Sequence, residues 1–357
     1  MRAKSHRYPD DNDIYTDTTY YDKEESYFDL GYQRLKIINI DSYPEFKYLK
    51  KLFINNNKLK SLPDSKYLPH LKELVCSNNE LTQIPLYPKL IYLDISHNKI
   101  LDCSHYNNSN IDYFDCSFNN GFKLNFNIPL CKQLYINNTG IENINLNYCP
   151  YLEILDCSNN LLKKIEGGNN LIEINIEDNK MNSIPVWSKL LRLMANNNAI
   201  NYLDTYPELV FLTINYNKLQ QINDQPKLKK IIANNNNIVK IGKMPNLKFI
   251  DLSYNKIKSL EISNNCKYAY LQFNDLQKIN ISDTNIFSKL HELQIDFSTY
   301  SKIYNLCQNY ISSINIQVSG EQINDVINIK EFIILYEIIL NAYYHNMIIT
   351  LYFNGYY

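Results

Sequence analysis

The sequence predicts a solenoid, in which short coils stack on one another and share one elongated hydrophobic core. Two observations predict this fold class. A pattern of apolar residues with Asn at its ninth position, LxxLxLxxNxL, recurs along most of the chain and is plainest in residues 209–219, 228–238 and 247–257. Successive copies begin at nearly constant intervals, and self-similarity at a fixed period is typical of repeat architectures. Because each coil packs only on its neighbours, 357 residues need not form two domains.

Thirteen coils are predicted, and we number positions from the first residue of each copy of the pattern. The first positions are Leu49, Leu71, Leu90, Ile111, Cys131, Leu152, Leu171, Leu190, Leu209, Leu228, Leu247, Cys266 and Leu290. The intervals between them are 22, 19, 21, 20 and 21 residues, then six of 19 and a last one of 24. Positions 1, 4, 6 and 11 are apolar and are expected to point inward. Position 14 is also apolar in every coil, which predicts a second inward column on the outer side.

Positions 4 and 6 alternate with polar or aromatic residues, as in a short strand with one buried face. Successive strands should therefore lie side by side and form a curved parallel β-sheet on the concave face. The Asn at position 9 is expected to satisfy backbone groups of the bend after the strand and of the adjacent coil. Thr139 replaces this Asn, so the coil that begins at Cys131 is expected to be weaker locally.

A coil of 19 residues leaves eight after position 11, too few for a helix with its two turns. These returning segments contain proline, for example Pro85, Pro88 and Pro185, and proline favours extended backbone. We therefore expect a convex face that is extended, polyproline-like or 3-10 rather than covered by helices.

The LxxLxLxxNxL pattern and the LxxIPxxPxL phrase over residues 81–90 resemble the short class of leucine-rich repeats, with units of 19 to 22 residues. Similar repeats occur in secreted bacterial effector proteins and in proteins of giant viruses that infect amoebae. The resemblance covers residues 49–303. It implies a solenoid that binds another protein, and action in a host cytoplasm or packaging in a virion.

The two ends depart from the pattern. Residues 1–29 are acidic and rich in Tyr, with almost no aliphatic side chains, which predicts a flexible arm; a docking or phosphotyrosine tail is the alternative. Residues 30–48 are expected to form an N-terminal capping coil, and residues 49–303 the repeats. Residues 304–357 are expected to form a small α+β C-terminal cap with strands near 310–318 and 347–353 and one helix over 321–344; a small effector module is the alternative.

Composition argues against several function classes. The net charge is -1, from 36 basic and 37 acidic residues, so no global field favours nucleic acid or a membrane surface. The six His residues are scattered, and we expect no metal, no cofactor and no catalytic site. Six of the eight Cys residues take inward positions, which favours free thiols and a reducing, intracellular compartment. Neither a signal peptide nor a transmembrane segment is evident.

The candidate site is the concave face, built from the outward positions 3, 5, 7 and 8. The partner-binding residues are predicted to be Tyr92, Asp94, Tyr113, Asp115, Phe118, Tyr135, Asp156, Phe211, Tyr216, Phe249, Asp251, Tyr254, Tyr268, Tyr270 and Phe273. Exposed aromatic rings among carboxylates are typical of protein interfaces, although aromatic residues also fill sheets because of their β-propensity. The sequence thus favours a non-catalytic protein that binds a protein partner. The alternative is a regulatory or targeting subunit of a ubiquitin ligase or phosphatase, with activity in, or recruited by, the C-terminal segment.

Overall fold

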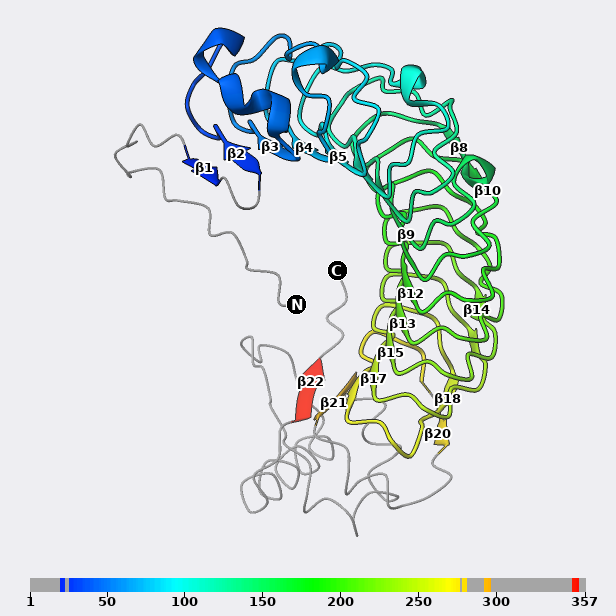
Figure 1. The fold of residues 1–357 in the computed structure, drawn as a ribbon. Helices are drawn as coiled ribbons and strands as arrows, with labels where there is room; N and C mark the ends of the chain where they lie inside the picture. The colour runs from blue at the N-terminus through cyan, green and yellow to red at the C-terminus, as the bar shows by residue number, and fades with distance from the viewer. Residues whose placement is uncertain (1–19, 23–25, 277, 281–291, 297–348, 353–357) are drawn as a thin grey trace.

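The chain forms an arc of stacked coils with a continuous sheet along its inner side (Figure 1). The structure, a computed structural model, describes residues 20–22, 26–276, 278–280, 292–296 and 349–352. Sixteen strands make up the concave sheet, and all neighbours are parallel except the first pair. The strands, in their order across the sheet, are β1 (Tyr20–Asp22), β2 (Tyr27–Asp29), β3 (Lys51–Phe53), β4 (Glu73–Val75), β5 (Tyr92–Asp94), β6 (Tyr113–Asp115), β7 (Gln133–Tyr135), β9 (Ile154–Asp156), β11 (Glu173–Asn175), β12 (Arg192–Met194), β13 (Phe211–Thr213), β15 (Lys230–Ile232), β17 (Phe249–Asp251), β19 (Tyr268–Tyr270), β21 (Glu292–Asp296) and β22 (Ile349–Tyr352).

The predicted register is confirmed. Each of the thirteen coils has a strand that begins at position 3, and equivalent positions of adjacent coils are paired, as Leu212 is with Ile231. In the twelve coils that begin at Leu49 to Cys266, position 4 points inward while positions 3 and 5 face the concave side. This arrangement brings residues that are 19 to 24 apart in the sequence into vertical columns.

One elongated core fills the solenoid. The residues at positions 1, 4, 6 and 11 are buried almost without exception, and most of the position-14 column is buried as well. All seven Cys residues of the described segments are buried and unpaired with one another, as the inward positions predict. Burial raises the pKa of the Cys103 and Cys149 thiols, so they remain protonated and behave as small apolar side chains.

The Asn residues at position 9 connect the coils as predicted. The side-chain nitrogen of Asn217 donates to the carbonyl oxygens of Asn215 and Ile214 in its own bend, and to that of Ala195 in the preceding coil at 2.9 Å. Its side-chain oxygen accepts from the backbone nitrogen of Ile200, also in the preceding coil, at 3.0 Å. An amide that is buried or partly buried thus replaces backbone hydrogen bonds that the bend interrupts, in every coil from Leu49 to Cys266 except the one that begins at Cys131.

A further inward column, besides the one at position 14, lies at position 17 and was not predicted. Tyr87, Tyr106 and Tyr206 are buried there, and their hydroxyl groups donate to the backbone carbonyl oxygens of Pro63, Pro85 and Pro185 at 2.6 to 2.9 Å. Trp187 takes the same position and donates to the carbonyl oxygen of Gly167. Each ring fills the convex side of the core while its polar atom satisfies the extended segment of the coil before it.

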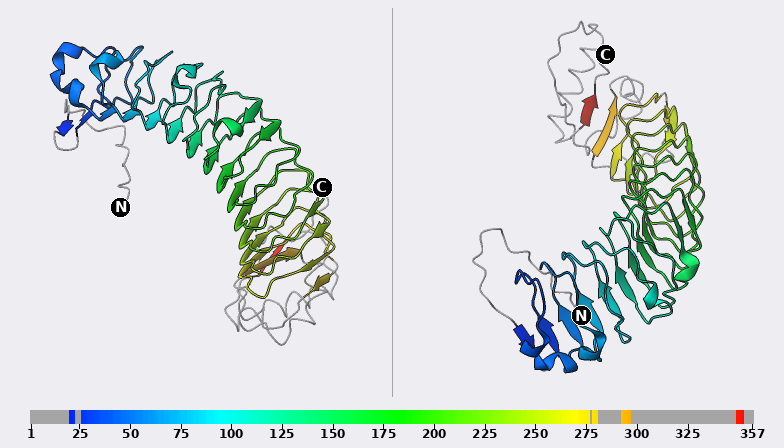
Figure 2. Two further views of the ribbon diagram at one scale, coloured as in Figure 1. Left: turned by 45° about the vertical axis from the view of Figure 1, so that its right-hand side comes forward. Right: turned by 90° about the horizontal axis from the view of Figure 1, so that it is seen from above.

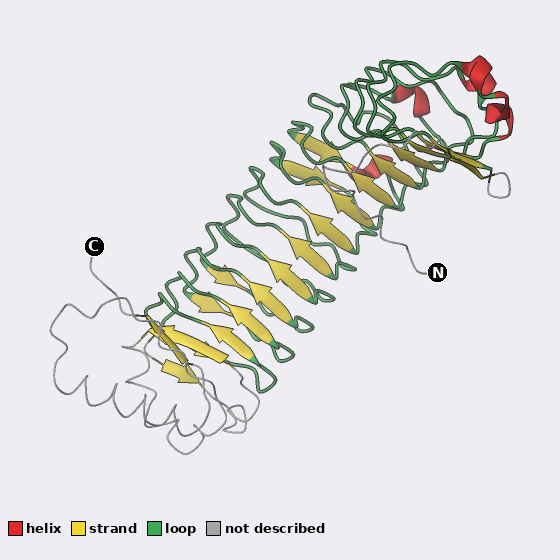
Figure 3. Cartoon of the chain, turned by 90° about the vertical axis from the view of Figure 1, so that its left-hand side faces the viewer, coloured by secondary structure: helices red, strands yellow, loops and turns green. Residues whose placement is uncertain are grey.

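The convex face has short extended segments and 3-10 turns, and no α-helix occurs among the described residues (Figure 3). Its strands are β8 (Asn143–Asn145) with β10 (Lys164–Glu166), β14 (Gln221–Ile222) with β16 (Lys240–Ile241), and β18 (Ser259–Glu261) with β20 (Lys278–Asn280). Its 3-10 helices are η1 (Ile40–Ser42), η2 (Pro44–Tyr48), η3 (Ser65–Tyr67), η4 (Ser104–Tyr106) and η5 (Leu146–Tyr148). The predicted extended or 3-10 convex face is confirmed.

The N-terminal boundary needs correction. Residues 1–29 were expected to be a flexible arm, but β2 pairs in parallel with β3 and belongs to the sheet. Phe28 and Leu30 are buried, and the ring of Phe28 packs edge-on against Phe46 at 5.7 Å. The capping coil therefore begins before Leu30, because these two apolar residues complete the hydrophobic end of the stack; residues 1–19 lie outside the described residues.

At the other end, β22 pairs in parallel with β21 and extends the sheet (Figure 2). This strand lies inside the interval 347–353 that was expected to be a strand. The expected strand near 310–318, the expected helix over 321–344 and the last repeat residue, Ile303, lie outside the described residues.

Candidate functional site

All fifteen predicted partner-binding residues lie on the concave side and none lies in the core. They occupy three columns. Position 3 holds Tyr92, Tyr113, Phe211, Phe249 and Tyr268; position 5 holds Asp94, Asp115, Tyr135, Asp156, Asp251 and Tyr270; position 8 holds Phe118, Tyr216, Tyr254 and Phe273. The first two columns stand on the strands, and the third follows the bend at the end of each strand.

Position 8 has a left-handed backbone in the twelve coils that begin at Leu49 to Cys266, with φ between 52° and 58°. Asn and Asp tolerate this conformation, and most coils use one of them there, as at Asn56, Asn138 and Asn235. His97, Phe118, Tyr216, Tyr254 and Phe273 are the exceptions. A bulky side chain in this conformation costs on the order of 1 kcal/mol, so these rings stand where a smaller residue would fold more favourably.

The rings at position 8 are also exposed. Exposure is 41% for Phe118, 59% for Tyr216 and 48% for Tyr254. Rings from adjacent coils stack on each other: Phe118 on His97 with 3.9 Å between ring centres, and Phe273 on Tyr254 with 4.3 Å. Along position 8 the rings thus form two stacked pairs and one single ring, Tyr216, separated by coils that carry Asn or Asp.

The first aromatic cluster consists of Tyr92, Tyr113, Phe118 and Tyr135. Tyr92 and Tyr113 are paired in the sheet, and their rings stack with centres 4.0 Å apart and planes 5° apart. Tyr135 follows at 5.3 Å from Tyr113 with a tilt of 38°. These three rings form a continuous platform across β5, β6 and β7.

Carboxylates accompany this platform. In the position-5 column the order across β5, β6, β7 and β9 is Asp94, Asp115, Tyr135 and Asp156. Burial first, and then the charge of Asp94, raise the pKa of Asp115 to about 6, and two hydrogen bonds from Ser117 oppose that shift. The two adjacent carboxylates therefore repel each other at neutral pH.

Each of these aspartates is held by a serine two residues later, which sequence reasoning missed. The Asp94 Oδ1 atom accepts from the backbone nitrogen of Ser96 at 2.9 Å and from its hydroxyl group at 2.7 Å. Asp115, Asp156 and Asp251 repeat this pair of bonds with Ser117, Ser158 and Ser253. The signal was the recurring Asp-x-Ser at positions 5 to 7. One oxygen of each carboxylate thus accepts hydrogen bonds from the bend after the strand, and this fixes the direction of the carboxylate on the concave face.

Cations lie beside aromatic rings in the middle of the sheet. Arg192 lies over the ring of Phe211 at 4.9 Å, and Lys230 lies 5.6 Å from Phe211 and 4.7 Å from Phe249. The position-3 column therefore alternates cation and ring, which is a favourable electrostatic contact for both. Two residues of the predicted site, Phe211 and Phe249, are thus already in contact with cations of the chain itself.

The second aromatic cluster consists of Phe249, Tyr254, Tyr268, Tyr270 and Phe273. Phe249 contacts Tyr270 edge-on at 5.4 Å and Tyr268 at 6.0 Å. The Tyr270 hydroxyl group donates to the Glu292 carboxylate at 3.0 Å, and the pKa of Tyr270 is raised to about 12 by burial and by this carboxylate. Ring contacts thus join the three tyrosines of the first cluster, while Phe118 stacks on His97 instead. The second cluster divides into Phe249 with Tyr268 and Tyr270, and a separate stacked pair of Tyr254 and Phe273. The role of both clusters in binding stays a prediction.

Comparison with known proteins agrees with this geometry. A family model described as leucine-rich repeats in two copies matches residues 49–89. A segment of 176 residues is 57% identical to a putative leucine-rich repeat protein of Acanthamoeba polyphaga mimivirus and covers 49% of this chain and 42% of that relative. The chain is a leucine-rich repeat protein. It spans less than half of the length of the viral relative.

Solved leucine-rich repeat structures share the fold. The leucine-rich repeat domain of APL1B superposes with a TM-score of 0.61 at 19% identity and covers 92% of this chain and 94% of that domain. The functional domain of InlJ from Listeria monocytogenes gives a TM-score of 0.60 at 19% identity and covers 81% of this chain and 72% of that domain. The predicted resemblance to leucine-rich repeat proteins, including those of viruses that infect amoebae, is confirmed.

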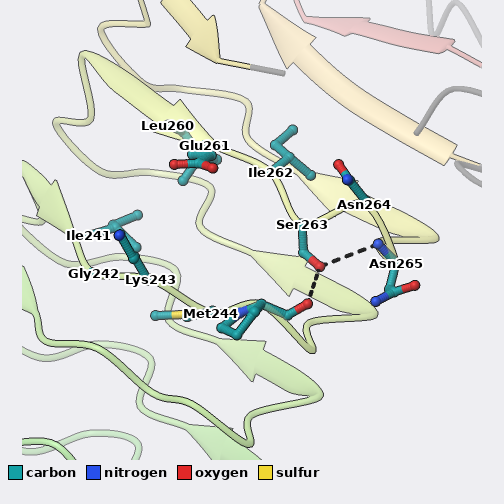
Figure 4. Close-up of a pocket in the computed structure, with 11 residues that line it drawn as sticks. Ile241, Gly242, Lys243, Met244, Leu260, Glu261, Ile262, Ser263, Asn264 and Asn265 are labelled. Carbon is teal, nitrogen blue, oxygen red and sulfur yellow. Dashed lines mark hydrogen bonds between the residues drawn. The ribbon is translucent and has the colours of Figure 1, made fainter. Parts of the chain in front are cut away.

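The convex side of this leucine-rich repeat protein has a hollow of about 370 Å³ between the coils that begin at Leu228 and Leu247 (Figure 4). The Ser263 hydroxyl group, which lines the hollow, is already hydrogen-bonded. It donates to the carbonyl oxygen of Pro245 at 2.7 Å and accepts from the Asn265 backbone nitrogen at 3.3 Å. Lys243 and Glu261 are its charged residues, and no nucleophile with a neighbouring base lines it. The hollow offers no arrangement for catalysis.

The described residues contain no group of three or more His, Cys, Asp or Glu side chains arranged to hold a metal ion. Within the same ranges, no helix has the length and apolar composition needed to cross a bilayer. The alternative function, an enzyme-associated subunit acting through residues 304–357, concerns a segment that is almost entirely outside the described residues, and none of these comparisons supports it.

Proposed function

We propose that this leucine-rich repeat protein is a non-catalytic binding protein that holds a protein partner against its concave face. Leucine-rich repeats generally serve protein–protein interaction, and one similar fold was solved as the LRIM1/APL1C complex, at a TM-score of 0.58. The predicted partner-binding residues are proposed to contact this partner.

One observation carries the proposal. Exposed aromatic rings stand at position 8 in a left-handed backbone that favours Asn, and the chain places Asn or Asp there in most other coils. Folding alone does not favour such rings, because they add strain and expose apolar surface. Contact with a partner would bury them, and aromatic residues are the most frequent energetic centres of protein interfaces.

The test replaces position-8 rings with Asn, the residue that the left-handed backbone of this position favours. A triple variant, Phe118→Asn, Tyr216→Asn and Tyr254→Asn, removes three rings while giving position 8 the residue that its backbone prefers. The protein and the variant would be used for affinity capture from Acanthamoeba lysate, because the viral relative comes from a virus of that host. We expect the variant to melt at the same temperature or higher and to lose the captured protein.

The matched control is Val186→Ser, which removes an apolar side chain of 48% exposure from the returning segment outside the concave face. This variant should capture the partner as the unchanged protein does. Equal capture by the triple variant, with its fold intact by circular dichroism, would show that the concave rings are not the binding surface.

A further inference from the structure

We propose that the first aromatic cluster, with Asp94, Asp115 and Asp156 beside it, is a docking site for arginine side chains of an extended protein segment. This inference rests on the proposed function and assigns the chemistry of the partner to one part of the concave face.

The geometry of the rings is the first observation. Tyr92 and Tyr113 are stacked with their planes nearly parallel, and Tyr135 continues the platform on the next strand. All three side chains point away from the core, and because Tyr92 and Tyr113 stack across adjacent strands, their ring faces turn along the sheet and their edges turn to the concave side. A guanidinium group is planar and can extend such a row of stacked rings, whereas an ammonium group makes only a point contact.

The second observation is an imbalance of charge at this place. Asp94 and Asp115 face each other in the sheet register, and Asp156 lies two strands farther. Among the residues that the structure describes, none of these three carboxylates forms an ion pair, although six ion pairs occur elsewhere along the solenoid. A cation between them would relieve their repulsion, and arginine adds bidentate hydrogen bonds to a carboxylate.

The third observation is an internal comparison. In the middle of the same sheet, Arg192 and Lys230 lie on the rings of Phe211 and Phe249 at 4.7 to 5.6 Å. There the chain supplies the cations that its concave rings contact. At β5 to β9 the rings and the carboxylates are present, and among the described residues no cation lies on these rings or pairs with these carboxylates, so a partner is the source that fits.

Other partner surfaces fit this site less well. An acidic segment or a nucleic acid backbone would meet three carboxylates of like charge. A purely apolar segment would bury these carboxylates without a countercharge, although their serine hydrogen bonds would remain, and burying an uncompensated charge is costly. An arginine-bearing segment satisfies both the rings and the carboxylates.

The test measures binding of fluorescein-labelled peptides by fluorescence anisotropy at low and at moderate salt. The probes are a 15-residue Gly/Ser peptide with three arginines and the same peptide with three citrullines, which keep the planar shape without the charge. A third peptide carries three lysines. We expect the arginine peptide to bind about tenfold more tightly than the citrulline peptide, and more tightly than the lysine peptide, with binding that weakens as salt increases.

The decisive variant is Asp94→Asn with Asp115→Asn. Asn keeps the side-chain oxygen that accepts from the backbone two residues later, as Asn175 does for Glu177 at 3.0 Å, so the bend should keep its shape. This variant should lose about tenfold in affinity for the arginine peptide, and Tyr92→Ser with Tyr113→Ser should lose a similar factor. Val186→Ser, on the returning segment outside the concave face, should leave the affinity unchanged.

Two results would overturn the inference: equal binding of the arginine and citrulline peptides, or equal affinity of the unchanged protein and the two-aspartate variant, each with the melting temperature preserved. The proposed function fails separately, in the capture experiment. If partner capture depends on the position-8 rings while the two-aspartate variant captures normally and no arginine peptide binds, the concave face binds a partner of different chemistry.

Discussion

The two halves of the solenoid follow the same pattern with different regularity. From Leu171 to Cys266 every coil has 19 residues, whereas the coils from Leu49 to Leu152 have 22, 19, 21, 20 and 21. Helices η3, η4 and η5 lie in the coils of 22, 21 and 21 residues, and no 3-10 helix occurs in the described 19-residue coils. The pairing of strands at positions 3 to 5 is the same in both halves. Extra residues are therefore accommodated on the convex side by compact 3-10 turns, and the concave register is preserved.

The two halves also differ in what their concave faces carry. The irregular half has stacked tyrosines with aspartates that form no ion pair within the described residues, and the regular half has rings in contact with Arg192 and Lys230. Position 7 varies as well: Ser holds an aspartate in both halves, at Ser117 and at Ser253, whereas Asn215 in the second half accepts from the backbone nitrogen of Asn234 at 2.9 Å. One backbone geometry thus presents two different surfaces, which differ in their residues at positions 3, 5 and 7.

The largest expected effect tests the coil-to-coil connection in the regular half. Asn217→Ala leaves the buried backbone nitrogen of Ile200 without its acceptor and removes the 2.9 Å bond to the carbonyl oxygen of Ala195. We expect a loss of about 3 kcal/mol in the free energy of unfolding, measured by urea denaturation. The control is Lys218→Ala on the exposed neighbouring position, which should change stability by less than about 0.5 kcal/mol. A small loss for Asn217→Ala would mean that the Asn column does not hold the coils together.

The equivalent change in the irregular half should cost less. The Thr139 hydroxyl group donates to the carbonyl oxygen of Ile136 at 2.9 Å, and that oxygen also accepts from Asn160 at 2.9 Å. Thr139→Ala therefore leaves the carbonyl oxygen satisfied, and we expect a loss of about 1 kcal/mol by the same denaturation experiment. If the two alanine variants lost equal stability, the predicted local weakness of the Cys131 coil would be contradicted.

A smaller effect concerns the acidic face of the irregular half. The pKa of Asp115 is raised from 3.8 to about 6, with Asp94 and then Asp156 as the charged neighbours that raise it. The folded state then holds this proton more tightly than the unfolded state, so this contribution to stability is greatest below about pH 4 and declines as pH rises through 6. Asp115→Asn should add about 1 kcal/mol at pH 7 and nothing at pH 3.5, measured by thermal unfolding. An equal gain at both pH values would exclude charge as the cause.

The sequence predicts some features of this fold and not others. Spacing alone predicted the parallel sheet and the inward columns, because every coil repeats the same few apolar positions. It missed the position-17 column, since Tyr87, Trp187 and Gln225 differ in chemistry and share only their place relative to the next coil. It also missed the start of the capping coil at β2, where one buried pair, Phe28 and Leu30, stands among acidic residues. The outward direction of the candidate residues on the strands was predicted correctly, because side chains alternate between the two faces of a strand.

What the sequence did not predict on the concave face is conformation and pairing. Nothing in the residue types at position 8 indicates a left-handed backbone unless the frequent Asn is interpreted as a conformational requirement. The contact of Lys230 with two rings depends on side-chain direction and on which strands are adjacent. Such contacts depend on the register between neighbouring strands, which cannot be deduced from the spacing of residues within one coil.

The smallest expected effect follows from that left-handed position. Tyr216 has φ of 52° and 59% exposure, and no ring contact with a neighbouring coil is recorded for it among the described residues. Tyr216→Asn should raise the free energy of unfolding by up to about 1 kcal/mol, because Asn tolerates this backbone and little buried surface is lost. Tyr254→Asn should gain less, since Tyr254 also gives up its stacking with Phe273 at 4.3 Å. Urea denaturation of both variants measures the difference. A loss of stability in Tyr216→Asn would show that the ring serves the fold, and the reason for attributing it to a partner would disappear.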